Sequence, residues 1–301
     1  MKNELIVLGG VGRSGTSILG KLVGSLKDVE FFYEPKTVDL LFSKIDDIDA
    51  ECWKALFKRN IYDDLLINSL AGRYINTNRH DISSIYNYKN EDEVFERLSR
   101  SHTQDELDAL AGDSIIAFKL LDSILYMDKV QQYFPKLRAL FIVRNPVDTI
   151  NSLLRKQWYS DSSLSIDSPE PASVYRVHNS MRVPRFVSDD DLDLWVALPE
   201  HQRYGYYYSF VLKKMCKFLD RDNLFIGYDR LLSKKDIVLN KILSHFHLHA
   251  GGKTDEVLSS IEHQGSARDQ HTLTRLPKSM REDIEDLYHT LMSHADKQLA
   301  G

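Results

Sequence analysis

The segment that most constrains this chain lies near its start, where residues 5–17 read LIVLGGVGRSGTS. An apolar run ends in Gly9 and Gly10, and apolar residues recur at helical spacing directly afterwards, from Ile18 to Leu26. The order is therefore strand, glycine-rich loop, helix. Such a loop points several backbone N–H groups at one spot, and the helix dipole adds partial positive charge there. The segment predicts an anion site, usually one for phosphate.

This loop differs from a nucleotide-binding P-loop at one decisive position. The P-loop pattern is G-x-x-x-x-G-K-[ST]. Gly10 and Gly15 have the right spacing, but Thr16 stands where the lysine belongs. Arg13 supplies a permanent cation with a flat donor fork instead. An ATP or GTP site would lack its main cation here. The alternative to an anion site is a tight strand-to-helix turn that binds no ligand.

A second strand-to-helix unit occupies residues 139–155, ALFIVRNPVDTINSLLR. The apolar run predicts a buried strand, Asn145 is a good N-cap, and Pro146 suits the first helical position. Arg144 then lies at the carboxyl edge of the strand, and Ser152 lies about two turns into the helix. An arginine and a hydroxyl that converge on a helix start can bind a second phosphate. Taken alone, either residue would be interpreted as an ordinary surface arginine or an ordinary helix serine.

Together, these units resemble the family of sulfotransferases that use 3′-phosphoadenosine 5′-phosphosulfate (PAPS). In that family a loop [KR]-S-G-[TS]-[TS] after the first strand holds the 5′-phosphosulfate. A later R-x-P, with a serine eight residues after the arginine, holds the 3′-phosphate. The chain matches the first pattern with residues 13–17, RSGTS, and the second with Arg144, Pro146 and Ser152. The resemblance implies a catalytic role for Arg13 and cofactor contacts from Gly12, Arg13, Ser14, Gly15, Thr16, Ser17, Arg144 and Ser152.

Weaker resemblances extend along the chain. Residues 31–35, FFYEP, are similar to the F-x-Y-E-P segment of carbohydrate sulfotransferases. Residues 225–232, FIGYDRLL, resemble the family's Y-E-D-L-L segment, and residues 264–268 resemble a late loop that closes over the nucleotide. These matches imply further cofactor contacts from Tyr228, Ser266 and Arg268.

Sulfuryl transfer also needs a base for the acceptor hydroxyl. Glu34, within the F-x-Y-E-P match, is the candidate, because family members with a glutamate there are thought to use it this way. Other members use a histidine, which here would be His178 or His201. Glu34 could instead act as an N-cap-like carboxylate on the helix that Pro35 begins.

Composition excludes several classes of protein. The net charge of −5 and the pI near 6.1 argue against a nucleic-acid binder. Cys52 and Cys216 lie far apart without metal-ligand spacing, so we expect neither a disulfide framework nor a zinc site. The transfer chemistry requires no metal. No apolar stretch approaches twenty residues and no signal peptide precedes the first strand, so we expect a soluble cytoplasmic protein without a transmembrane segment.

The spacing of apolar runs predicts an α/β fold of the P-loop-like, three-layer kind, with helices flanking a central parallel sheet. Strands are expected at about 4–9, 29–33, 114–119, 139–143 and 223–228, within a single domain that spans 1–301. Five polar residues stand at or just after the ends of these strands, where sites in parallel sheets lie: Arg13, Glu34, Lys119, Arg144 and Tyr228.

Three other segments carry expectations. Residues 46–111 read as a helical insertion, and the serine-rich residues 159–193 as an active-site lid or a disordered loop. Residues 203–208, RYGYYY, lie on a helix predicted over 195–219, where the tyrosines either pack in the core or stack on sugar rings.

The sequence therefore predicts a sulfotransferase that moves the sulfuryl group of PAPS to an acceptor hydroxyl and leaves adenosine 3′,5′-bisphosphate (PAP). The F-x-Y-E-P match favours a carbohydrate or glycolipid acceptor, with a peptide tyrosine or a small alcohol left open. The competing interpretations are a P-loop kinase-like phosphotransferase and a non-catalytic nucleotide-binding protein.

Overall fold

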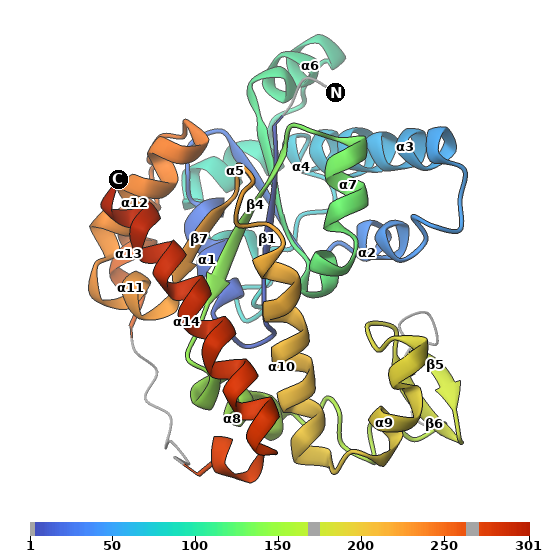
Figure 1. Ribbon diagram of the computed structural model, residues 1–301. Helices are drawn as coiled ribbons and strands as arrows, with labels where there is room; N and C mark the ends of the chain where they lie inside the picture. Colours follow the sequence, from blue (N-terminus) through green and yellow to red (C-terminus); the bar gives the residue numbers. More distant parts are fainter. Residues whose placement is uncertain (1–3, 168–174, 263–270) are drawn as a thin grey trace.

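A five-stranded parallel sheet organises the molecule, whose computed structural model describes residues 4–167, 175–262 and 271–301. Within these residues the strand order is β2-β3-β1-β4-β7, and Figure 1 shows the sheet between its covering helices. The strands are β1 Leu5–Gly10, β2 Val29–Tyr33, β3 Ile115–Lys119, β4 Leu137–Val143 and β7 Leu224–Gly227. Each lies within two residues of its predicted bounds, and the predicted parallel α/β sheet is confirmed.

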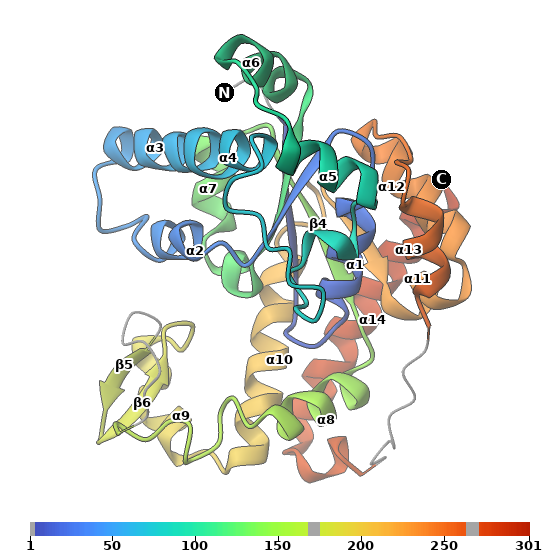
Figure 2. The ribbon, with the colours of Figure 1, turned by 180° about the vertical axis from the view of Figure 1, so that it is seen from behind.

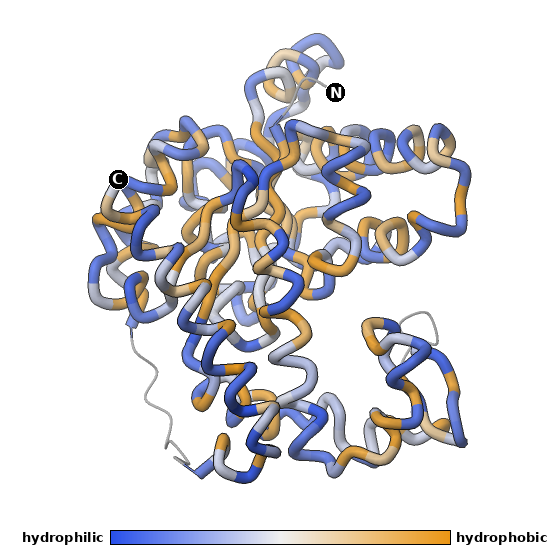
Figure 3. The backbone as a smooth tube through the Cα atoms, in the orientation of Figure 1, coloured by the Kyte–Doolittle hydropathy of each residue, from blue (hydrophilic) through white to orange (hydrophobic). Residues whose placement is uncertain are grey.

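Helices cover both faces of the sheet because the strands are apolar on both sides. Alternate residues of β1 and β4 point to opposite faces and join two separate cores. In the first core they pack against α10 (Glu200–Cys216), α14 (Lys278–Ala300) and α7 (Met127–Tyr133). In the second they pack against α1 (Thr16–Gly24), α12 (Lys235–Phe246) and α13 (Thr254–Ser260). Figure 2 shows the molecule from behind, with these three helices labelled. In Figure 3 the hydrophobic colour accordingly gathers along the central strands.

The remaining elements connect and extend these layers. The other α-helices are α2 Lys36–Ser43, α3 Ala50–Arg59, α4 Asn68–Leu70, α5 Glu91–Ser99, α6 Gln104–Asp113, α8 Pro146–Lys156, α9 Leu192–Ala197 and α11 Tyr228–Ser233. A π-helix spans Asn60–Ile67, and 3₁₀ turns lie at Ile85–Asn87, Leu121–Leu125, Asp189–Asp191 and Leu273–Arg275.

Two predicted segments differ from expectation in detail. Residues 50–113, between β2 and β3, are largely helical, in the place of the predicted insertion. In the segment 159–193, the described residues include an antiparallel pair, β5 Tyr175–His178 and β6 Met181–Pro184. Of the two alternatives, the disordered loop does not describe that part, and the lid function stays a prediction. The helix predicted over 195–219 is divided into α9 and α10 because Pro199 is the N-cap of the second helix.

A buried ion pair anchors the helical segment to the edge of the sheet. The Glu30 carboxylate of β2 accepts hydrogen bonds from the two terminal guanidinium nitrogens of Arg97 on α5, at 2.7 and 2.8 Å, and from the Ser69 hydroxyl at 2.7 Å. Burial alone would raise the pKa of Glu30, but Arg97, Lys89 and Ser69 outweigh it and hold the pKa below its usual value. The carboxylate is therefore charged although it lies inside the protein.

We expect Arg97→Ala to lower the free energy of unfolding by about 3–5 kcal/mol, because it leaves the Glu30 charge buried without its partner. Arg100 is the control, since it bonds Glu96 and Glu106 on the surface and its loss should cost less than about 1 kcal/mol. Urea denaturation of both variants measures the difference. Equal effects would contradict the anchoring role.

Candidate functional site

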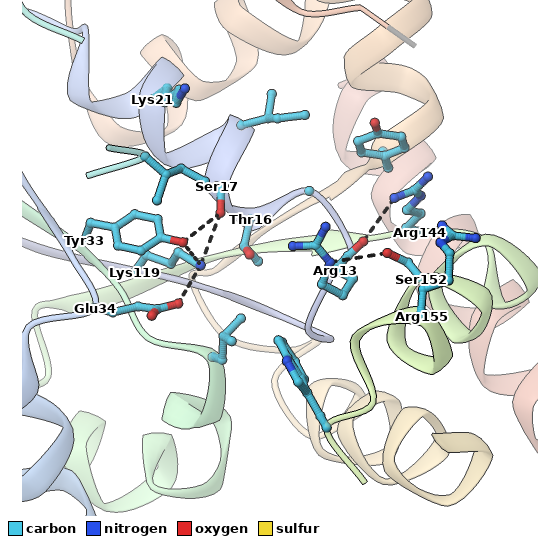
Figure 4. Close-up of a pocket in the computed structure, with 16 residues that line it drawn as sticks. Arg13, Thr16, Ser17, Lys21, Tyr33, Glu34, Lys119, Arg144, Ser152 and Arg155 are labelled. Carbon is cyan, nitrogen blue, oxygen red and sulfur yellow. Dashed lines mark hydrogen bonds and ion pairs between the residues drawn. The ribbon is translucent and has the colours of Figure 1, made fainter. Parts of the chain in front are cut away.

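The candidate site is a cleft of about 560 Å³ at the carboxyl ends of the parallel strands, shown in Figure 4. The five polar residues that the sequence places at strand ends all line it: Arg13, Glu34, Lys119, Arg144 and Tyr228. They meet because parallel strands end on the same edge, and because β1 lies between β3 and β4.

The glycine loop opens into this cleft at the start of α1. Gly15 is the N-cap of α1 with φ of 106°, a conformation that favours glycine. A Cβ atom at Gly15 would also lie 2.6 Å from the Tyr228 ring. Thr16 and Ser17 begin the helix and line the cleft. The loop therefore offers the N–H groups of a helix start to any anion in the cleft.

Gly12 and Ser14, which the resemblance implies as cofactor-binding residues, do not line the cleft. Gly12 lies between the Trp158 ring and Tyr207, and a Cβ at Gly12 would lie 2.4 Å from the ring of Trp158. Its N–H donates to the Tyr207 hydroxyl at 3.2 Å. Ser14 is only 1% exposed, and its hydroxyl has no hydrogen-bond partner in the described structure. Both residues therefore belong to the part of the loop that packs inside the protein rather than to the wall of the cleft.

The second predicted phosphate element lies beside the first. Asn145 caps α8 by accepting from the N–H groups of Val147 and Asp148, as predicted. Arg144 donates to the Arg13 carbonyl at 3.0 Å, and Arg13 Nε donates to the Ser152 hydroxyl at 3.3 Å (Figure 4). Two motifs about 130 residues apart in sequence thus contact each other directly.

Arg144 retains unused donor capacity in this position. Its guanidinium carbon lies 4.4 Å from the centre of the Tyr228 ring, which supports the planar group from one side. Its Nε is buried and has no protein partner among the described residues. A buried guanidinium N–H without a partner suits a phosphate oxygen.

At the other end of the cleft, Glu34 forms an ion pair with Lys119. Lys119 Nζ lies 2.7 Å from Glu34 Oε1 and 3.2 Å from both the Ser17 and Tyr33 hydroxyl oxygens (Figure 4). The Lys119 side chain is 4% exposed and that of Glu34 is 29% exposed. Helix α2 begins at Lys36 with Pro35 as its N-cap, one residue later than an N-cap Glu34 requires. Glu34 therefore offers a carboxylate to the cleft next to a cation that also contacts the glycine loop.

Sequence reasoning gave no role to Lys119, although it placed the residue at a strand end. The register that pairs Lys119 with Tyr33 brings it beside Glu34, and that register could not be read from spacing. Lys21 was also missed. It lines the cleft from α1, donates to the Asn87 side chain at 3.1 Å, and has its pKa lowered by burial.

Other predicted residues lie elsewhere. Ser266 and Arg268 fall outside the described residues. His178, on β5, lies 2.7 Å from the Asp193 carboxylate, and His201 contacts the Arg275 carbonyl at 3.2 Å. Neither histidine lines the cleft.

Three of the four tyrosines of α10 are too buried to form a surface for sugar stacking. Tyr204, Tyr207 and Tyr208 are each at most 1% exposed. The structure thus favours the core-packing alternative for these three residues.

A smaller cavity of about 120 Å³ is lined by residues next in sequence to two residues of the cleft. Leu121 and Trp158 line the cleft, and the residues that follow them, Asp122 and Tyr159, line the cavity. The rest of the cavity wall combines charged, polar, aromatic and aliphatic side chains: Asp39, Ser43, Leu125, Tyr126, Tyr175, Pro184, Arg185 and Phe186. Burial, followed by the charges of Asp39 and Glu34, raises the pKa of Asp122 to about 6.

Two further findings concern metal-ligand groups and long apolar helices among the described residues. These residues contain no group of three or more His, Cys, Asp or Glu side chains arranged to hold a metal ion. None of their helices is both long and apolar enough to cross a bilayer.

Comparison with known proteins places the chain in a family. The sulfotransferase family profile matches residues 6–250. No curated protein sequence gives a significant match. Similar solved structures include the sulfotransferase domain of a Synechococcus olefin synthase, at 14% identity over 96% of this chain and 95% of that chain with a TM-score of 0.48. A sulfotransferase from Alicyclobacillus acidocaldarius is 12% identical over 99% and 96% with a TM-score of 0.42, and a mouse sulfotransferase complexed with PAP is 14% identical over 99% and 87% with a TM-score of 0.41. Since the profile covers most of its length, the chain belongs to the sulfotransferase family, as the two phosphate motifs predict.

Proposed function

We propose that this chain transfers the sulfuryl group of PAPS to a hydroxyl of a carbohydrate or glycolipid, with Glu34 as the base. One observation carries the proposal. A single cleft holds the glycine loop and Arg144 with Ser152, the two elements predicted to bind phosphate, at one end and a carboxylate–ammonium pair at the other. The first arrangement suits a nucleotide with phosphates at two positions, and the second suits a hydroxyl that must lose a proton.

The residues present fit PAPS at both of its charged positions. Arg144, with its unpartnered buried Nε, and Ser152 would hold the 3′-phosphate. Arg13 and the helix start at Thr16 and Ser17 would hold the 5′-phosphosulfate. When bound, PAPS supplies the sulfuryl group and PAP as the leaving group.

The proposed chemistry of the chain is proton removal and charge stabilisation. The bond from sulfur to the 5′-phosphate oxygen breaks, the bond from sulfur to the acceptor oxygen forms, and the acceptor proton passes to Glu34. Lys119 holds the Glu34 carboxylate in place and contacts Ser17 of the loop. Lys119 thereby supplies a cation near the position where the loop, with Thr16, lacks the P-loop lysine. A fixed cation and fixed N–H groups stabilise developing negative charge without reorganising.

The smaller cavity supports a carbohydrate acceptor. Asp39 and Asp122 can accept hydrogen bonds from hydroxyl groups, and the aromatic rings can pack against the apolar face of a sugar. Asp122 lines this cavity next to Leu121 of the cleft and interacts with the charge of Glu34, so an acceptor seated there would lie near Glu34.

We expect PAP to bind without magnesium and more tightly than ATP with magnesium, since the cleft has two phosphate positions and no P-loop lysine. Isothermal titration calorimetry of both nucleotides measures this. Tighter binding of ATP with magnesium would contradict the choice of donor. Turnover on a panel of sugar, peptide and small-alcohol acceptors then tests catalysis and the class of acceptor.

Glu34→Gln should cut the turnover rate about 10²–10⁴-fold, because the amide cannot take the acceptor proton, while leaving the dissociation constant for PAP nearly unchanged. Glu4→Gln is the matched control, since Glu4 also pairs with a cation, Arg138, but at the amino end of β1. Turnover is measured with saturating PAPS. A near wild-type rate for Glu34→Gln would assign the proton to another group.

Asp122→Asn should stabilise the protein more at pH 7.5 than at pH 4.5. The folded-state pKa of Asp122, about 6, lies above the ordinary value, so folding favours the protonated acid. The charged form therefore costs stability as the pH rises through 6, and asparagine avoids that cost. Urea denaturation at both pH values measures the difference, with Asp105→Asn on exposed α6 as control. A pH-independent difference would contradict the burial of this charge.

A further inference from the structure

Three loops of the cleft contain main-chain polar groups that bond side chains rather than other main-chain groups. The Arg144 carbonyl follows the last paired residue of β4. In a helix it would accept from the N–H four residues later, but that N–H, of Asp148, donates to the Asn145 side chain. Gly12 lies in the glycine loop, and Tyr159 follows α8. Buried groups of this kind must find partners, because leaving one unpaired costs about as much as a lost hydrogen bond.

One face of α10 supplies side-chain partners for the Arg144 carbonyl, the Gly12 N–H and both main-chain groups of Tyr159. The Tyr208 hydroxyl donates to the Arg144 carbonyl at 2.6 Å, and the Tyr207 hydroxyl accepts from Gly12 N–H at 3.2 Å. The Tyr204 hydroxyl accepts from Tyr159 N–H at 3.2 Å, and Arg203 donates to the Tyr159 carbonyl at the same distance. Positions 203, 204, 207 and 208 share one helix face, because residues four apart lie one above the other.

The contacted groups are neighbours of residues that line the cleft. Gly12 precedes Arg13, Tyr159 follows Trp158, and the Arg144 carbonyl belongs to the arginine predicted to hold the 3′-phosphate. Burial raises the pKa of Tyr208 well above the ordinary tyrosine range, so its hydroxyl keeps the proton that it donates. The hydrogen bonds therefore hold each loop at a residue that lines the cleft or at the residue next to it.

We infer that Tyr207 and Tyr208 are positioning residues of the donor site, which set the glycine loop and Arg144 in their binding arrangement before the nucleotide arrives. This inference rests on the proposed function only for the identity of the nucleotide. It assigns to the RYGYYY segment a role in donor binding through the backbone, in place of contact with the acceptor.

The test compares three single tyrosine variants of the full chain. Tyr208→Phe and Tyr207→Phe each remove one hydroxyl that contacts a loop. Tyr206→Phe is the matched control, because its hydroxyl lies on the same helix and donates to Asp191, outside the cleft, at 2.8 Å. We expect the first two to weaken PAP binding about two- to tenfold, the range for loss of one hydrogen bond, and the control to leave it unchanged. Weakening by Tyr206→Phe equal to that by Tyr208→Phe would overturn the inference.

A double-mutant cycle separates positioning from general destabilisation. If Tyr208 acts through Arg144, then Tyr208→Phe should weaken PAP binding in the wild type but add little further loss in the Arg144→Ala background. Equal fold losses in both backgrounds would contradict action through Arg144. A lower melting temperature with an unchanged dissociation constant would show a merely structural role.

The outcome also distinguishes this inference from the proposed function. If the wild type does not bind PAP, the proposed donor is wrong, and the same variants are then compared with ATP and magnesium. Binding of PAP by the wild type, with no difference among the three tyrosine variants, would leave the proposed function standing and overturn the inference alone.

Discussion

The parallel pairing of β1 with β4 decides where the rest of the site can lie. Its register sets Gly10 opposite Ile142, so the glycine loop and the Arg144 turn leave the sheet side by side. From β1 the chain crosses to β2 on one side, and from β4 it continues to β7 on the other. This divergence of connections at a shared edge is where ligands bind in open α/β sheets. The contact between Arg13, Arg144 and Ser152 depends on that pairing.

Most of the fold, and the residues of the candidate site that follow the ends of strands, could be predicted because their sequence signals are local. Apolar runs marked the five central strands, and Asn145 with Pro146 marked the start of α8 within a residue. The pair β5–β6 was missed because its short strands lie in a polar, serine-rich segment in which apolar residues do not form a run. The same local signals placed Glu34 and Lys119 at strand ends without showing that they touch.

The missing part of the site consists of contacts between residues that are distant in sequence. Lys119 reaches Glu34 and Ser17 only because β3 lies between β1 and β2 in a particular register. The tyrosines of α10 illustrate the same limit. Their clustering left core packing and sugar stacking as alternatives, and the partner of a buried hydroxyl is set by the packing of the helix against loops up to 195 residues away. Hydrophobic periodicity contains no information on those partners.

The backbone groups of the loops are divided between the protein interior and the cleft. Those that point inward are bonded by α10, and those at the start of α1 face the cleft, where a phosphate can bond them. Donors that are already oriented stabilise charge without the cost of reorganising at the moment of reaction. The proposed acceptor side is built differently, from the Glu34 carboxylate, which is 29% exposed, and from a small cavity whose walls include α2, the turn after β3 and the β5–β6 region. Under the proposed function, we expect changes in those walls to alter the choice of acceptor while leaving the hydrogen bonds between α10 and the loops intact.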